Sequence, residues 1–172
     1  MKASCLEALN KAFTEAGSRF IVVGGLAVVA HGYLRATQIA DIVIELLPNN
    51  IERAFTALES LGYKPTVPIT PSSFSKPENR LNWTIQKNMT VLQFWSDEHR
   101  DTPVDVFINA PFDFTSEWKI AYRQSLGHSK QEIRFASLAT LIDMKETASR
   151  PQDLVDLEHL RWIQKEESKN DE

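Results

Sequence analysis

Apolar residues recur along the chain with two different spacings, and the change from one to the other predicts alternating helices and strands. The run 20–23 is wholly apolar and mostly β-branched, which is typical of a buried strand. The pair Gly24-Gly25 separates this run from a short apolar helix over 26–31. Before the strand, a helix over 4–16 is predicted by apolar residues spaced three or four apart: Leu6, Leu9, Phe13 and Ala16.

The rest of the chain continues this alternation of elements. Residues 64–77 contain four prolines and several serines, so they predict an irregular loop. The charged segment 96–101 lies between two apolar runs and favours a hairpin. Strands are predicted over 40–47, 89–95, 104–108 and 131–135, and helices over 51–61, 116–126, 138–148 and 154–164. The pattern predicts an α+β (α/β) fold with a small mixed sheet flanked by helices and a C-terminal helix pair.

Length and composition narrow the class of protein. The 172 residues and 42% apolar content predict a single domain over 1–164, followed by a charged, flexible tail over 165–172. The formal net charge of −4 excludes a histone-like polyanion binder. The longest apolar stretch, 20–30, is too short to span a bilayer, which needs about 20 residues. With one cysteine and no secretory signal pattern, a cytoplasmic protein without membrane partners is expected.

Two aspartates interrupt apolar strands, and they are the first candidate chemistry. Asp41 opens the apolar run of the second predicted strand, and Asp105 lies between Val104 and Val106. A buried carboxylate is costly unless it is paired, hydrogen-bonded or bound to a cation. If the two strands are neighbours, the carboxylates could converge on a hard cation such as Mg²⁺. Alternatively, each could cap a loop N–H or pair with Arg35 or Arg150.

The Gly24-Gly25 pair between a strand and a helix has two interpretations. Glycine lacks a Cβ, so its backbone can turn sharply and approach a phosphate group. Alternatively, the pair forms an ordinary turn, where glycine pairs are common. The segment lacks the third glycine of the dinucleotide-binding pattern, and the chain has no Walker-type phosphate loop.

Taken together and in order, these segments resemble a known superfamily. The sequence Val-Gly-Gly-Leu-Ala at 23–27, then Arg35 and Thr37, then the strand at Asp41 resembles the front of the nucleotidyltransferase (polymerase β-like) superfamily. The closest likeness is to the AbiEii-type toxin branch and its uncharacterised relatives. Asp105 resembles the third carboxylate of that pattern, and the run from 138 to 157 resembles its C-terminal helix pair. The resemblance covers scattered blocks between about residues 20 and 160.

The resemblance implies a fold, a reaction and a set of site residues. It implies metal-dependent transfer of a nucleotidyl group from a nucleoside triphosphate to an RNA, protein or small-molecule acceptor, with an antitoxin protein as a possible partner. Asp41 and Asp105 would be catalytic and bind Mg²⁺ or Mn²⁺, and Asp105 would accept the acceptor proton. The nucleotide would be bound by Gly24, Gly25, Arg35, Thr37, Lys145 and Arg150. Lys145 and Arg150 could equally be an ordinary helix end with salt bridges to Asp143 or Asp153.

One position departs from the superfamily pattern. Counting from Arg35 and Thr37, the paired strand carboxylates fall at positions 39 and 41, and position 39 is isoleucine. Residues two apart on a strand point to the same face, so an aspartate pair at this spacing can hold one metal. Ile39 cannot act as a ligand, which predicts a weakened site. The alternative is a catalytically inactive member that binds a nucleotide or a partner protein. His31 and His99 are further, softer candidate ligands.

Overall fold

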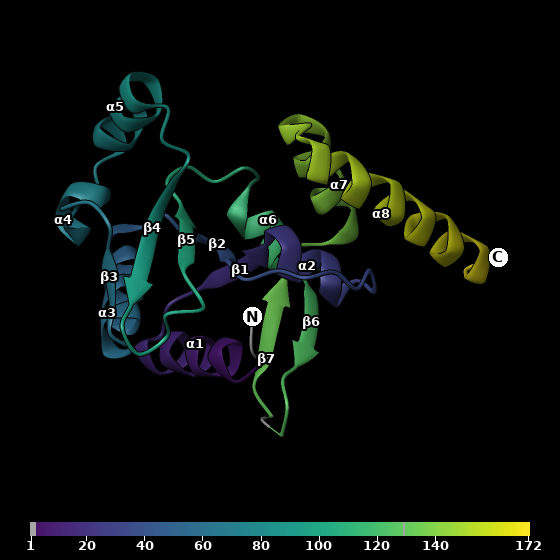
Figure 1. Cartoon of the computed structure of the whole chain (residues 1–172), viewed down its shortest axis with the longest axis horizontal. Coiled ribbons are helices and arrows are strands. Elements are labelled where there is room, and N and C mark those ends of the chain that lie inside the picture. The colour runs from purple at the N-terminus through teal and green to yellow at the C-terminus, as the bar shows by residue number, and fades with distance from the viewer. Residues whose placement is uncertain (1–2, 129) are drawn as a thin grey trace.

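A seven-stranded mixed sheet forms the centre of the molecule. The computed structural model describes residues 3–128 and 130–172 (Figure 1). The strand order is β3-β4-β5-β2-β1-β7-β6. The pairs β2–β5 and β1–β7 are parallel, and the other neighbouring pairs are antiparallel. The strands are β1 (Phe20–Val23), β2 (Ala40–Ile44), β3 (Tyr63–Pro65), β4 (Val91–Ser96), β5 (Val104–Phe107), β6 (Tyr122–Ser125) and β7 (Glu132–Phe135).

Helices α1 (Ala3–Ala16) and α3 (Pro48–Ser60) cover one face of the sheet. Phe13 of α1 packs on Phe20 with ring centroids 4.5 Å apart, and Phe55 of α3 packs on Phe94 at 5.2 Å. The strand register places Phe20 and Phe94 on the same face. This face therefore carries much of the apolar core, and it leaves the opposite face available for polar groups.

The opposite face is associated with α2 (Gly24–Ala30), α6 (Phe114–Ile120) and α7 (Leu138–Ala148). Helix α2 begins directly where β1 ends. The buried carboxylate of Glu117 joins α6 to the start of α7, because it accepts the Ser137 N–H and the Thr140 hydroxyl, each at 2.6 Å. Helix α8 (Pro151–Asn170) packs against α7 and then extends away from the sheet to the C-terminus (Figure 1).

The predicted mixed α/β architecture is confirmed, including the C-terminal helix pair and the hairpin between β4 and β5. Strand β1 has the predicted bounds, and α7 matches the predicted helix over 138–148. The structure extends α8 to Asn170, so residues 165–170 of the expected tail are helical. Within residues 3–128 and 130–172, no helix is both long enough and apolar enough to cross a membrane.

Two segments differ from the sequence prediction. The helix predicted over 116–126 ends at Ile120, and the chain continues as the edge strand β6. Pairing with β7 satisfies the backbone of β6, and this long-range pairing overrides local helix propensity. The predicted loop over 64–77 contains α4 (Pro71–Phe74), and α5 (Pro77–Lys87) follows it. Proline starts each of these helices, because the first helical turn needs no proline N–H.

Candidate functional site

The two strand aspartates lie side by side on one face of the sheet. Strands β2 and β5 are parallel neighbours, and Asp41 is the register partner of Asp105. Register partners point to the same face, so both carboxylates lie on the face opposite α1 and α3. The structure therefore brings together two residues that are 64 positions apart in the sequence.

The electrostatic environment disfavours charge on both carboxylates. Burial raises the pKa of Asp41 to about 6, and repulsion from Asp105 adds to this effect. Burial also raises the pKa of Asp105, although a hydrogen bond from Gln93 Nε2 at 3.1 Å partly offsets the rise. Within the described residues, no lysine or arginine is close enough to either carboxylate to form an ion pair. Two adjacent carboxylates in this situation are suited to binding a cation.

The glycine pair packs directly against site side chains. Gly24 has a φ of +65°, and a Cβ at this position would lie 2.2 Å from Asp41 Oδ2. A Cβ on Gly25 would lie 2.8 Å from both Arg35 Nη2 and Thr37 Oγ1. Any larger residue would displace these groups. The positive φ and the nearby Asp41 carboxylate thus require glycine at position 24, and glycine at 25 leaves room for the Arg35 and Thr37 side chains.

Three predicted cations from three segments of the chain act on the charge of Asp41. Lys145, Arg150 and Arg35 each lower the pKa of Asp41, although burial and Asp105 outweigh them. Arg35 comes from the irregular segment 31–39, Lys145 from α7, and Arg150 from the turn before α8. These three cations therefore lie close enough to Asp41 to act on its charge.

Lys145 and Arg150 both bind carboxylates of α8. The Lys145 ammonium is buried and lies 2.9 Å from Asp153 and 2.9 Å from Asp156. The Arg150 side chain is 76% exposed, and its Nε is 2.7 Å from Asp153. Asp153 is one of the two partners considered in the sequence, and Asp143 has no part in these pairs. Lys145 is therefore a buried internal cation rather than a solvated one.

Position 39, where the sequence departs from the superfamily pattern, provides no metal ligand in the structure. Ile39 is 37% exposed and lies one residue before β2, so it supplies no ligand next to Asp41. His31 is bonded to the Ala136 carbonyl at 2.8 Å, and His99 is paired with Cys5. In the part of the chain that the structure describes, no group of three or more His, Cys, Asp and Glu side chains is arranged to hold a metal. Asp41 and Asp105 are therefore a pair of carboxylates without a third such side chain arranged beside them in the described part of the chain.

Sequence reasoning missed two contributors to the site. Gln93 is the register partner of Asp105 across the β4–β5 hairpin, and its amide binds that carboxylate. Asp156 binds both Lys145 and Arg35. The spacing of Asp153 and Asp156, three residues apart on one helix, was a signal that both could face α7.

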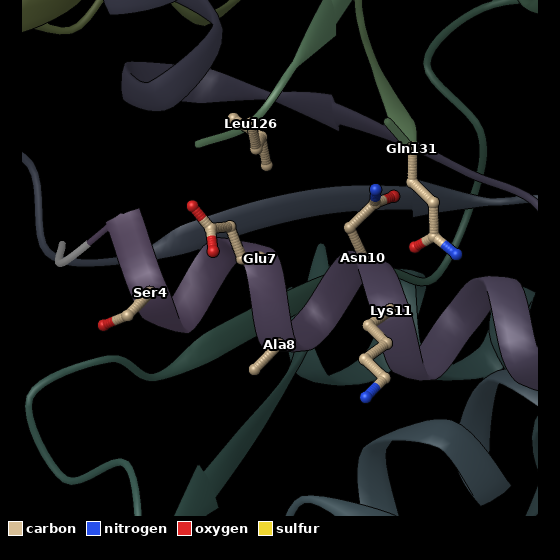
Figure 2. A pocket seen from close by; sticks show the side chains of 7 residues that line it. All are labelled: Ser4, Glu7, Ala8, Asn10, Lys11, Leu126 and Gln131. Atoms are coloured by element: carbon tan, nitrogen blue, oxygen red, sulfur yellow. The ribbon is translucent and has the colours of Figure 1, made fainter. Parts of the chain in front are cut away.

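Two clefts elsewhere on the surface are separate from these residues. One, of about 230 Å³, lies between α1 and the β6–β7 hairpin (Figure 2), and it is lined by Ser4, Glu7, Ala8, Asn10, Lys11, Leu126 and Gln131. A second, of about 340 Å³, is formed where α2, β6 and α7 meet. Neither includes Asp41, Asp105 or a predicted nucleotide-binding residue, although His31 lines the second. Ligand pockets of enzymes usually measure about 300–1,000 Å³, so size alone does not favour the first. The convergence of charged groups makes the Asp41–Asp105 region the stronger candidate.

The sequence matches no family model and no curated protein. Two solved structures are similar to the chain along most of its length. The lincosamide antibiotic adenylyltransferase LnuA, bound to lincomycin, aligns with a TM-score of 0.56 and 15% identity, covering 88% of this chain and 90% of its own. The chain has a nucleotidyltransferase-like fold. An antigenic nucleotidyltransferase-like protein from Paracoccidioides brasiliensis aligns with a TM-score of 0.53 and 14% identity, covering 92% and 74%. Neither match concerns an AbiEii-type toxin, so that branch stays a prediction.

Proposed function

We propose that the protein binds a nucleoside triphosphate and transfers its nucleotidyl group to an acceptor, with one divalent cation on Asp41 and Asp105. The observation that carries this proposal is the register of β2 and β5, which places the two carboxylates side by side on a nucleotidyltransferase-like sheet. Both carboxylates have raised pKa values, as expected for acidic groups that lack a cation. Mg²⁺ or Mn²⁺ suits an all-oxygen pair of ligands.

The surrounding residues take distinct roles in this proposal. The Arg35 and Arg150 guanidinium groups and the Thr37 hydroxyl bind phosphate oxygens, because a guanidinium forms paired hydrogen bonds to such groups. Gly24 and Gly25 let these groups approach the backbone. Lys145 acts through its charge, since its ammonium is bound to Asp153 and Asp156.

The transfer step uses Asp105 as the base. The acceptor hydroxyl gives its proton to the Asp105 carboxylate, the acceptor oxygen bonds to the α-phosphorus, and the bond to pyrophosphate breaks. The raised pKa of Asp105 suits a proton acceptor. A bound divalent cation would supply neutralisation of the charge that develops on the phosphate. An RNA end, a protein hydroxyl and a small molecule are the acceptor classes to be compared.

A second candidate function is binding of a nucleotide or a partner protein without turnover. Ile39 favours it, because a two-metal site lacks a ligand at that position. The burial of Lys145 favours it as well, since this cation cannot move to a phosphate without breaking two ion pairs.

One experiment separates the two functions. The purified chain is incubated with α-³²P-labelled nucleoside triphosphates and Mg²⁺ or Mn²⁺, with total RNA, cell protein or small hydroxyl compounds as separate acceptors. We expect transfer by the wild type, a loss of at least about 100-fold in Asp105→Asn, and a gain in Ile39→Asp. In the same samples, Ile39→Asp should bind Mn²⁺ roughly tenfold more tightly, since it adds a carboxylate ligand.

The matched control is Asp101→Asn, which removes a carboxylate from the exposed β4–β5 loop. This variant should behave like the wild type. Nucleotide and Mn²⁺ binding without transfer, in both the wild type and Ile39→Asp, would support the binding function. Absence of nucleotide and Mn²⁺ binding in both would refute nucleotidyl transfer and nucleotide binding, and it would leave only the binding of a partner protein.

A further inference from the structure

Five charged side chains form a continuous chain between segment 31–39 and the C-terminal helix pair. Asp156 binds Arg35 and Lys145, and Lys145 also binds Asp153, which binds Arg150. The two carboxylates belong to α8, and each bridges two cations from other parts of the chain. This arrangement ties α7, α8 and segment 31–39 into one unit beside Asp41.

Asp156 is the most heavily bonded member of the chain. It is 0% exposed, and the Lys145 ammonium lies 2.9 Å from its Oδ2. The Arg35 guanidinium lies against both of its oxygens, with Nη2 donating to Oδ2 at 3.0 Å and Nε 2.9 Å from Oδ1. Gln152 donates to Oδ1 at 3.0 Å. Lys145, Arg35 and Gln152 thus all contact one buried carboxylate, and the contacts from Arg35 Nη2 and Gln152 Nε2 are hydrogen bonds.

The edge of the Arg35 guanidinium that binds Asp156 also lies against the glycine turn. Its Nη2, which donates to Asp156, is the atom that lies 2.8 Å from the Cβ position of Gly25. Segment 31–39 has no helix or strand of its own, so its position depends on such contacts. Tyr33 provides a second contact, since its ring stacks on His159 of α8 at 3.8 Å. Asp156 therefore determines where the Arg35 charge is placed relative to Gly25.

We propose that Asp156 is a positioning residue that holds the Arg35 guanidinium against the Gly24-Gly25 turn, so that Arg35 is already oriented to bind a nucleotide phosphate. The nucleotide part of this inference rests on the function proposed above. The positioning part rests only on the contacts of Asp156 and Arg35. Asp153 serves as the natural comparison, because it bonds Lys145 and Arg150 but does not touch Arg35.

The test measures backbone hydrogen exchange and nucleotide affinity on the same variants of the full chain. Asp156→Asn keeps the shape of the side chain and removes its charge. We expect amide exchange in segment 31–39 to become roughly tenfold faster, because Arg35 loses its ionic partner. In Asp153→Asn, exchange in this segment should stay at the wild-type rate. Arg35→Gln should reproduce the effect of Asp156→Asn from the other side of the pair, and it serves if Asp156→Asn does not fold.

Nucleotide affinity is measured by titration with ATP in the presence of Mn²⁺. We expect Asp156→Asn to weaken ATP about tenfold, and to have no further effect in the Arg35→Gln background. A residue with only a general structural role would weaken ATP equally in both backgrounds.

The outcomes distinguish the two proposals. If segment 31–39 loosens in Asp156→Asn but the wild type binds no nucleotide, positioning holds and the proposed function fails. If the wild type binds ATP and Asp156→Asn binds it equally well, the positioning role is refuted while the proposed function stands. Unchanged exchange in segment 31–39 in both Asp156→Asn and Arg35→Gln would refute the positioning role directly.

Discussion

The molecule contains two pairs of aspartates that differ mainly in their partners. On the sheet, Asp41 and Asp105 lie side by side, and within the described residues neither forms an ion pair with a lysine or arginine. On α8, Asp153 and Asp156 are more deeply buried, yet together they bind Lys145 and two arginines. Burial alone would disfavour the charged form of the carboxylates in both pairs. The number of cations bound to each pair therefore decides whether the charged form is stabilised.

Burial acts to raise the pKa of both Asp41 and Asp153, and the partners of each carboxylate decide the direction of the net shift. For Asp41, burial and Asp105 raise the pKa to about 6. For Asp153, burial also acts to raise the pKa, but hydrogen bonds from Arg150 and Lys145 outweigh it and lower the pKa to about 2. The charges of Asp153 and Asp156 are thus balanced by lysine and arginine side chains of the protein itself. The sheet pair is left with excess negative charge, and this is the physical reason to expect an external cation there and not on α8.

The largest expected effect on stability comes from removing Lys145, the cation that Asp153 and Asp156 share. Lys145→Met keeps the length and apolar stem of the side chain but leaves two buried carboxylates with less compensation. We expect the free energy of unfolding to fall by about 3–5 kcal/mol, as measured by urea denaturation at pH 7. Lys64→Met, at an exposed position, is the control and should change it by less than about 0.5 kcal/mol. An equally small change in Lys145→Met would mean that the ion pairs of Lys145 with Asp153 and Asp156 do not stabilise the protein.

The opposite sign is expected for the sheet pair. Asp41→Asn removes a charge that has no ion-pair partner, so it should stabilise the protein in the absence of metal. The pKa rises from 3.8 to about 6, and this shift of about 2.2 units sets an upper limit of about 3 kcal/mol at about 1.36 kcal/mol per unit. Partial exposure reduces the expected gain to about 1–2 kcal/mol.

The pH dependence of this difference identifies its cause. Between pH 3.8 and about 6, folded Asp41 keeps a proton that the unfolded chain has lost, so wild-type stability falls as pH rises through this window. The difference between Asp41→Asn and the wild type should therefore be near zero at pH 4 and largest above pH 7 in urea denaturation. Asp153 behaves in the opposite way, since its contribution is lost as pH falls from 3.8 towards 2. A difference that is independent of pH would exclude the carboxylate charge as the cause.

The sequence singled out residues that the structure brings close together, but it did not show how their side chains are connected. Asp41 and Asp105 stood out because each is a charge in an apolar strand, and the parallel pairing of β2 and β5 then places them together. Lys145 was also found, but its burial was not, because local sequence does not show that the side chain turns inward towards α8. The role of Asp156 depends on Arg35, which is 121 residues away. Long-range pairs of this kind have no local pattern.

The difference between local patterns and long-range contacts also explains which elements of the fold were predicted wrongly. Strand β1 and helix α7 were predicted accurately, since their apolar spacing is a local property. Strand β6 exists because β7 pairs with it, and residues 122–125 are too exposed to show a clear buried face. The prolines at 71 and 77 indicate helix starts as readily as loops, and only the packing of Phe74 and its neighbours decides between them.

The smallest expected effect concerns Gln93, a neutral hydrogen-bond partner of Asp105. Gln93→Leu removes the amide that donates to Asp105 Oδ1 at 3.1 Å, so the pKa of Asp105 should rise further. Gln93 is exposed, and water replaces much of the lost hydrogen bond, so we expect the free energy of unfolding at pH 7 to fall by less than about 1 kcal/mol. In an Asp105→Asn background the loss should shrink, because the acceptor is no longer charged. Urea denaturation of the four proteins of this cycle gives the coupling energy. A coupling of zero would mean that the hydrogen bond from Gln93 does not stabilise the charged form of Asp105, and Mn²⁺ affinity would then be unchanged in Gln93→Leu.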